Sequence, residues 1–229
     1  MEFTKELRDF FINIQQNKKP SISIEIGSNE GTFSNRMKSI CDKSKIWAFE
    51  ANPYVYEKYK KEHEDINFIN CAVFDKEDNL EFKIQRAFDY TAGNNGLFER
   101  RNGISYKING FQYTENNIQY ETISVPSIVI DNFFKDKITN DDTICMWIDV
   151  EGASKQVLEG SVETLKMTKS VFIEVEHEEF WKNQWLSDDV INFFNVNKFS
   201  LLARDYQWYD DKPRQENFIF VNNHFLQNL

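Results

Sequence analysis

The segment Ser21-Ile-Ser-Ile-Glu-Ile-Gly-Ser-Asn-Glu-Gly31 decides the fold class that this sequence predicts. Residues 21–26 are typical of a short buried strand, and Gly27 ends it. Apolar side chains then recur at helical spacing over residues 33–41. A strand, a glycine turn and a helix in this order mark the position at which doubly wound α/β folds bind a cofactor.

Strands and helices continue to alternate along the chain. Residues 45–50 predict a second strand, and Asn52 followed by Pro53 predicts a capped helix. Further strands are expected at residues 66–70, 143–149, 171–176, 199–203 and 217–221, and further helices at residues 153–165 and 187–194, the last with Ser187 as its cap. Such alternation indicates parallel βαβ units, with the last two strands pairing antiparallel across the polar segment 204–216.

The length and composition predict one folded domain. The chain has 229 residues, of which 41% are hydrophobic, 28% charged and 15% aromatic, which is enough for one sizeable core. We expect a single domain over residues 1–229, opening with an amphipathic helix over residues 1–19. The strand–helix alternation fails over residues 76–132, which we interpret as an insertion over one end of the sheet that carries substrate-binding residues.

Charge and cysteine content limit the partners and the compartment. The 27 Lys and Arg residues against 37 Asp and Glu residues give a net charge of −10, which repels phosphate backbones, so we expect no nucleic-acid partner. The three cysteines, Cys41, Cys71 and Cys145, form no C-x-x-C pair and fit reduced thiols. Without an apolar run near ~18 residues or a signal-peptide core, we expect no membrane span and a cytoplasmic protein.

The glycine turn favours a ligand without phosphate. Its spacing is G-x-x-x-G where a dinucleotide fingerprint has G-x-G-x-x-G, and Glu25 and Glu30 flank it, so a pyrophosphate would be repelled. A ligand with a positive end, such as S-adenosylmethionine, suits these acids. Glu50 ends the second strand 25 residues after Glu25, where a carboxylate can accept both hydroxyls of a ribose. The alternative is that the glycines only make a tight turn and that Glu50 is a solvated strand end.

Five blocks of the sequence resemble, in order, those of a known family. They are Ile24-Glu-Ile-Gly-Ser-Asn-Glu-Gly31, Ala48-Phe-Glu-Ala-Asn-Pro53, Asn70-Cys-Ala-Val73, Trp147-Ile-Asp-Val-Glu-Gly152 and Phe172-Ile-Glu-Val175. The family is that of the FkbM-type S-adenosylmethionine-dependent methyltransferases, and the likeness spans residues 22–221. The chain departs from it at Glu25, where Asp is commoner, at Ala51, where Pro is usual, and at Ser154, where a second Glu often stands. The last departure leaves the acceptor open.

The resemblance implies a Rossmann-like class I methyltransferase fold: a mostly parallel seven-stranded sheet with an antiparallel last strand and helices on both faces. It also implies O-methylation, often of a sugar hydroxyl in glycan, polysaccharide or natural-product assembly. The residues assigned to the cofactor are Glu25, Gly27, Ser28, Asn29, Gly31, Glu50, Ala51, Asn52, Cys71, Ala72 and Asp149.

Four titratable residues are expected to converge on the crevice where a methyl group would be transferred. Asp149 and Glu151 follow the fourth parallel strand, and Glu176 and His177 follow the fifth. His177 is the preferred general base because its ordinary pKa of ~6.5 suits the task, with Asp149 orienting it or accepting from the substrate hydroxyl. A structural histidine, and acids placed only to favour a helix dipole, are the alternatives. Mg²⁺ or Mn²⁺ is possible here but not favoured, because no spacing defines an octahedral set.

A compact polar and basic patch in the insertion is the candidate substrate site. Asn94, Asn95, Arg100 and Arg101 form it and could receive a phosphorylated or nucleotide-linked sugar, although a solvated loop is the simpler interpretation. Two rival functions stay open. A nicotinamide-dependent sugar-nucleotide oxidoreductase would need a Tyr-x-x-x-Lys pair, and Tyr56 and Lys60 match that spacing on the helix after Pro53. A non-catalytic cofactor-binding module would keep the pocket without turnover.

Overall fold

A computed structural model of the protein describes residues 2–85, 95–101, 106–108, 111–113, 119–209 and 212–225. The first part of the chain alternates helices and strands. These elements are α1 (Glu2–Lys18), β1 (Ile22–Ile26), α2 (Thr32–Ile40), β2 (Lys45–Glu50), α3 (Pro53–Tyr59) and β3 (Asn67–Asn70). The cap predicted at Asn52 is confirmed, because its side chain accepts a hydrogen bond from Tyr54 N at 3.0 Å.

The remaining elements divide into a central group and a C-terminal group. The central group is β4 (Ala72–Val73), β5 (Asn79–Gln85), β6 (Tyr106–Ile108), β7 (Phe111–Tyr113), β8 (Tyr120–Ile128) and α4 (Ile130–Phe134). The C-terminal group is β9 (Ile144–Ile148), α5 (Ser154–Glu159), α6 (Val162–Leu165), β10 (Thr168–Glu176), α7 (Ser187–Val196), β11 (Phe199–Tyr209) and β12 (Lys212–Asn222).

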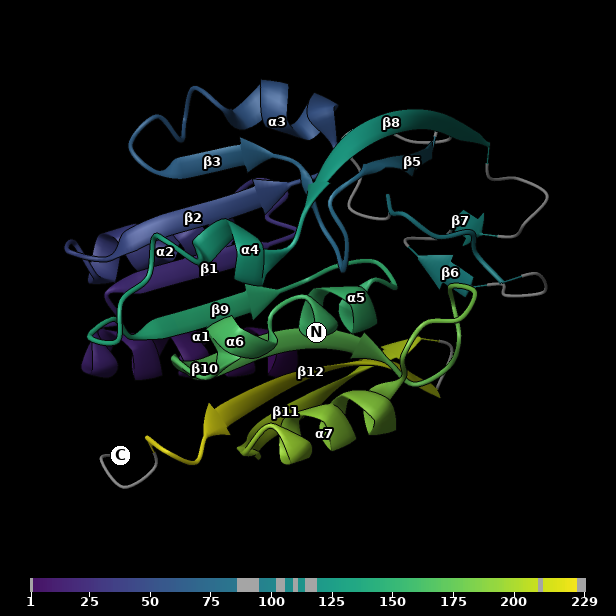
Figure 1. The fold of residues 1–229 in the computed structure, drawn as a ribbon. Coiled ribbons are helices and arrows are strands. Elements are labelled where there is room, and N and C mark those ends of the chain that lie inside the picture. The colour runs from purple at the N-terminus through teal and green to yellow at the C-terminus, as the bar shows by residue number, and fades with distance from the viewer. Residues whose placement is uncertain are drawn as a thin grey trace.

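Seven strands form one sheet in the order β11-β12-β10-β9-β1-β2-β3 (Figure 1). In this sheet the neighbouring strands β3, β2, β1, β9 and β10 run parallel, whereas β12 lies antiparallel between β10 and β11. The predicted fold class, a mostly parallel seven-stranded sheet with an antiparallel last strand, is confirmed. All the parallel strands point their carboxyl ends toward the same edge of the sheet, where α/β folds bind ligands (Figure 1).

Helices cover both faces of this sheet. On one face, α1 and α2 bury an aromatic cluster in which the rings of Trp147 and Phe172 stack with centroids 3.8 Å apart. Phe11 of α1 and Phe33 of α2 complete the cluster. On the other face, α4, α5, α6 and α7 pack on the aliphatic side chains of β1, β9 and β10 (Figure 1).

Within the segment interpreted as an insertion, β5, β6 and β7 lie beyond the carboxyl ends of the parallel strands, and β8 runs back from there toward α4 (Figure 1). Here β8 pairs antiparallel with β5 and then parallel with β4, and β6 and β7 form a separate pair. The segments at residues 80–84 and 120–125 lie within β5 and β8. This arrangement puts the insertion over the crevice that the glycine turn opens.

Two local expectations were wrong. The segment 204–216 is not a polar loop, since β11 continues to Tyr209 and β12 begins at Lys212. Its polar side chains bond across the strands, as Asp205 Oδ1 accepts from Asn217 N at 3.2 Å. Ser187 is not the cap of α7, because Asp189 accepts from Leu186 N at 3.0 Å and the Ser187 hydroxyl donates to Glu176 O.

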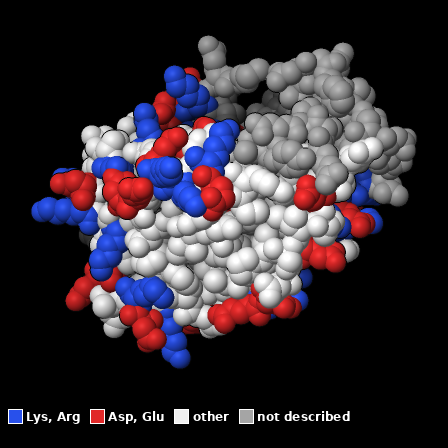
Figure 2. Space-filling model, turned by 90° about the horizontal axis from the view of Figure 1, so that it is seen from above, with Lys and Arg blue, Asp and Glu red and all other residues white. Residues whose placement is uncertain are grey.

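Charged side chains of both signs lie on the surface of the described residues. In Figure 2, which looks down on one face, Lys and Arg side chains are interspersed with Asp and Glu, and a large uncharged area lies between them. No helix in the described ranges has both the length and the hydropathy to cross a membrane.

Candidate functional site

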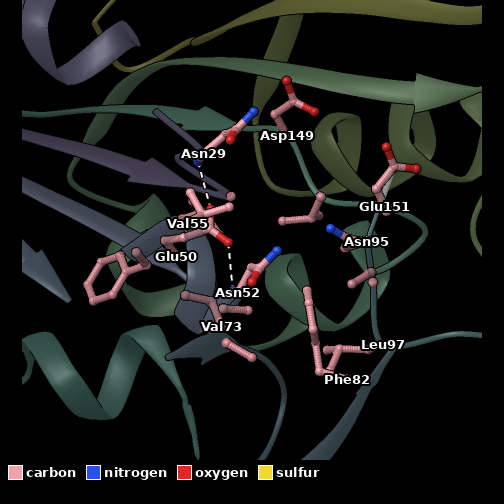
Figure 3. Close-up of a pocket in the computed structure, with 18 of the residues that line it drawn as sticks. Asn29, Glu50, Asn52, Val55, Val73, Phe82, Asn95, Leu97, Asp149 and Glu151 are labelled. Carbon is pink, nitrogen blue, oxygen red and sulfur yellow. Dashed lines mark hydrogen bonds between the residues drawn. The ribbon is translucent and has the colours of Figure 1, made fainter. Parts of the chain in front are cut away.

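A cavity of about 300 Å³ lies at the carboxyl ends of the parallel strands (Figure 3). One wall comes from the loops after β1, β2 and β3, and the opposite wall comes from β10, β11 and β12. The β9 loop lies between them because β9 pairs with both β1 and β10. The insertion contributes Phe82, Asn95 and Leu97. The volume falls at the small end of the range of ligand pockets, ~300–1,000 Å³.

Gly27 allows the loop after β1 to lie directly against β9. Its φ is +74°, and a Cβ atom there would lie 1.9 Å from the backbone oxygen of Asp149. The Gly27 N–H donates to Phe49 O at 3.0 Å, and Asp149 N donates to Ile26 O at 3.0 Å. Only glycine combines this left-handed conformation with so close an approach, so the turn joins three strand ends into one edge of the cavity.

Glu50 joins two loops of the wall that follows β1, β2 and β3. Its Oε2 accepts from Asn29 N and its Oε1 accepts from Asn52 N, both at 2.7 Å (Figure 3). Burial, and then repulsion from Asp149, raises its pKa to about 7 even though these donors lower it. A carboxylate has about four acceptor positions, so two remain for hydroxyl donors in the cavity. This donor-poor, acceptor-rich site fits the diol of a ribose.

Three residues assigned to the cofactor lie outside the cavity lining. Glu25 accepts from Ser34 N at 2.9 Å and from the Ser34 hydroxyl, and therefore binds the first turn of α2. Burial raises its pKa to about 7. Gly31, with φ +72°, packs against the ring of His63, whose Nε2 lies 3.0 Å from Glu30 O. Ser28 is buried beside them. These residues support the loop from behind.

The rest of the wall after β1, β2 and β3 is apolar or amide-bearing. Asn29, Ala51, Asn52, Cys71 and Ala72 line it, and Asp149 lines the cavity from the β9 loop. The side-chain amide of Asn70 donates to Glu50 O at 2.7 Å, which holds the ends of β2 and β3 together. Burial raises the pKa of Cys71 to about 12, so its thiol stays neutral. A flat apolar group such as a purine base suits this surface.

Of the four candidate catalytic residues, Asp149 and Glu151 line the cavity (Figure 3). Burial raises the pKa of both carboxyls. For Glu151 the value is about 8, with repulsion from Glu176 adding to burial and the nearby Arg100 opposing it. Glu151 can therefore hold a proton near neutral pH.

Glu176 and His177 do not line the cavity. Glu176 Oε2 accepts from Gln184 Nε2 at 2.7 Å, and burial raises its pKa to about 8. His177 Nε2 contacts Glu216 Oε1, and its ring stacks on Tyr206 with centroids 5.4 Å apart. Both side chains therefore have other partners, Gln184 for Glu176 and Glu216 of β12 for His177, and neither is part of the described cavity lining.

Three polar side chains of the described cavity lining escaped the sequence reasoning: Glu174, Gln207 and Gln215. Glu174 had a detectable signal, because it interrupts an apolar strand and lies on the face opposite Ile173 and Val175. The two glutamines fall in the segment that was expected to be a loop. Their place in the cavity depends on the pairing of β11 with β12, which has no local signal.

The candidate substrate patch is divided. Asn94 lies outside the described residues. Asn95 lines the cavity, and its Oδ1 accepts from Gln85 N at 2.8 Å. The guanidinium of Arg100 lies over the ring of Trp181 at 4.7 Å, and Arg101 pairs with Glu179 at 3.4 Å. Neither arginine is a lining residue.

The described residues contain no group of three or more His, Cys, Asp or Glu side chains arranged to hold a metal ion. The Tyr-x-x-x-Lys pair also lies apart from the cavity lining, since Tyr56 stacks on Phe68 with centroids 5.0 Å apart and Lys60 pairs with Glu57.

Comparison with known proteins identifies a family match. The methyltransferase FkbM domain matches residues 25–207. No curated protein matches the sequence. The crystal structure of methyltransferase FkbM from Methylobacillus flagellatus KT is similar at a TM-score of 0.50 and 10% identity, covering 87% of this chain and 44% of that one. The chain thus spans less than half the length of that protein.

A second similar structure is that of the plantazolicin methyltransferase BamL, in complex with a triazolic desmethylPZN analog and S-adenosylhomocysteine. Its TM-score is 0.50 at 8% identity, covering 93% of this chain and 84% of that one. At such identities the two structures show a shared fold.

Proposed function

The chain belongs to the FkbM family of S-adenosylmethionine-dependent methyltransferases, and from this premise we propose that it methylates a hydroxyl group of a saccharide, free or carried on a nucleotide, in glycan or polysaccharide biosynthesis. The observation that carries the proposal is Glu50, a buried carboxylate at the end of β2 that faces the cavity beside the Gly27 turn. A cytoplasmic location is part of the proposal.

The wall of the cavity that follows β1, β2 and β3, which we call the cofactor wall, has residues that fit S-adenosylmethionine. Asn29, Glu50 and Asn52 would hold the ribose, and the apolar surface around Cys71 and Ala72 would hold the adenine. When bound, S-adenosylmethionine supplies a methyl group on a sulfonium, which is already an activated leaving group. The protein therefore has to align the acceptor, an effect worth up to ~7–11 kcal/mol.

Asp149 is the proposed partner of the acceptor hydroxyl. It lies at the end of β9, between the cofactor wall and the opposite wall from β10, β11 and β12, which we call the β10 wall. Burial raises its pKa. A carboxylate whose pKa is raised by burial can accept a hydrogen bond from the hydroxyl and take up its proton more readily than an ordinary aspartate. Glu151, two residues on, lines the same part of the cavity and is the second candidate for this role.

Calorimetric titration with S-adenosylhomocysteine tests the assignment of Glu50. Glu50→Gln removes the charge but keeps one acceptor oxygen, and we expect affinity to fall about tenfold to a hundredfold, because hydrogen bonds to a charged group are worth ~1.5–3 kcal/mol. The control is Glu57→Gln, an exposed acid on α3 outside the cavity, which should leave the affinity unchanged. Equal affinity of Glu50→Gln and the unmodified protein would remove the ribose assignment. Tighter binding of a nicotinamide dinucleotide in a parallel titration would favour an oxidoreductase.

A further inference from the structure

The wall of the cavity opposite Glu50 is built from three neighbouring strands. Glu174 of β10 accepts from Gln207 Nε2 of β11 at 2.8 Å and from Gln215 Nε2 of β12 at 3.1 Å, one bond to each carboxylate oxygen. Gln207 and Gln215 are register partners in the antiparallel pair. The carboxylate is therefore held in place from two sides while all three side chains line the cavity.

This wall has the hydrogen-bonding character of a hydroxyl site. Each oxygen of Glu174 receives one amide N–H and has room to accept a second donor. Side-chain amides carry both donors and acceptors, so the wall presents both kinds of group. A hydroxyl, which donates one hydrogen bond and accepts others, matches such a wall better than an ammonium group, which only donates.

The charges around this wall oppose an anion. The described lining residues include four carboxylates, Glu50, Asp149, Glu151 and Glu174, and no Lys, Arg or His. Burial, and then repulsion from Asp149 and Glu151, raises the pKa of Glu174 well above its usual range. Two guanidinium groups outside the lining act on these acids: Arg8 lowers the pKa of Asp149 and Glu174, and Arg100 lowers that of Glu151. A phosphate or carboxylate at this end would therefore meet acids that line the cavity, with no lining cation to pair with it.

We propose that Glu174, Gln207 and Gln215 form a subsite that binds an uncharged hydroxyl of the acceptor, next to the hydroxyl that is methylated, and that this subsite excludes phosphate and carboxylate groups. The inference rests on the proposed function. In this proposal the carboxyl group of Glu174, held by two amides, selects the substrate. Any anionic part of the acceptor would lie away from the β10 wall.

Binding measurements on the full chain saturated with S-adenosylhomocysteine test the subsite. The probes are a panel of hexose methyl glycosides and the 6-phosphate esters of the same glycosides, titrated by ligand-observed NMR. The unmodified protein should bind at least one glycoside and bind its phosphate ester at least tenfold more weakly. Glu174→Gln should weaken the glycoside about tenfold to a hundredfold, because the amide nitrogen that replaces one carboxyl oxygen cannot accept a hydrogen bond. Its affinity for S-adenosylhomocysteine should change less than about twofold.

Asp205→Asn is the matched control. Asp205 is a buried carboxyl on β11, two residues before Gln207, and its Oδ1 accepts from Asn217, a role that an asparagine oxygen can keep. It lies outside the cavity lining, so glycoside binding should not change. Failure of the unmodified protein to bind S-adenosylhomocysteine would overturn the proposed function itself. Three results obtained with normal binding of S-adenosylhomocysteine would overturn this inference alone. The first is equal glycoside affinity in Glu174→Gln and the unmodified protein, and the second is that no glycoside binds. The third is that the phosphate esters bind as tightly as the glycosides.

Discussion

Single residues at the strand ends determine the geometry of the cavity. Gly27 is the clearest case, because the obstacle to a side chain there is the backbone oxygen of Asp149 and no side chain can move to relieve it. Glu50 depends on this turn, since the Asn29 N–H that it accepts belongs to the same loop.

Gly27→Ala is expected to disable cofactor binding. The substitution adds left-handed strain of ~1–2 kcal/mol and forces the β1 loop away from β9, which separates Asn29 from Glu50. We expect affinity for S-adenosylhomocysteine, measured by calorimetry, to fall by more than tenfold. Unchanged affinity would mean that the loop can bind its ligand without touching β9.

His177→Gln tests whether His177 is the general base that its sequence position suggests or the structural residue that its contacts indicate. His177 packs on Tyr206 and contacts Glu216, whose side chain is fully buried, so losing the imidazole should cost ~1–3 kcal/mol of unfolding free energy in urea titrations. Methyl transfer to a glycoside that binds should stay within about threefold. A hundredfold loss of turnover at normal stability would instead identify His177 as the general base.

At the scale of elements, α1 is an integral part of the fold. Phe11 is 0% exposed and packs with ring centroids 5.9 Å from Phe33, 6.0 Å from Trp147 and 5.7 Å from Phe172. These contacts join the N-terminal helix to α2, β9 and β10. The loop after β9 carries Asp149, and β10 itself carries Glu174.

Phe11→Ala should therefore destabilise the protein by ~3–5 kcal/mol, the usual cost of emptying an aromatic core position. Phe10→Ala is the control on the same helix, because Phe10 is 44% exposed and its loss should cost less than ~1 kcal/mol. Urea unfolding followed by tryptophan fluorescence measures both. Similar losses for the two variants would show that α1 does not depend on its buried face.

At the scale of the whole molecule, buried acids couple stability to pH. Folding raises the pKa of Glu25 and Glu50 from 4.5 to about 7 and that of Glu176 to about 8, in each case chiefly through burial. Between about pH 4.5 and 8 the folded protein therefore holds more protons than the unfolded chain, and its stability falls as pH rises, by up to ~1.4 kcal/mol per pH unit for each group.

Urea unfolding at pH 5.5 and 7.5 should show this loss as a decrease of at least ~1 kcal/mol in the free energy of unfolding. Glu25→Gln removes one of the titrating groups and should reduce the decrease. Stability that is constant or rises over this interval would contradict the raised pKa values.

The sequence by itself determined the order of strands and helices, the glycine turn and the position of Glu50. These features are local: a buried strand, a glycine that ends it and a capped helix depend on residues within about ten positions of one another. The parallel sheet and its antiparallel last strand followed from that order and from the resemblance of five blocks, and both are confirmed.

Only the tertiary structure decided which acids face the cavity. Glu25 binds α2 and His177 binds Glu216, whereas Glu174 faces inward with Gln207 and Gln215. Each of these outcomes depends on a partner that packing or strand pairing brings close. The pairing of β12 with β10 is such a case, because β12 lies between β10 and β11 in the sheet. A carboxylate at a strand end carries no mark of the partner it will meet, because that partner is chosen by long-range pairing and by the free energy of burying a charge.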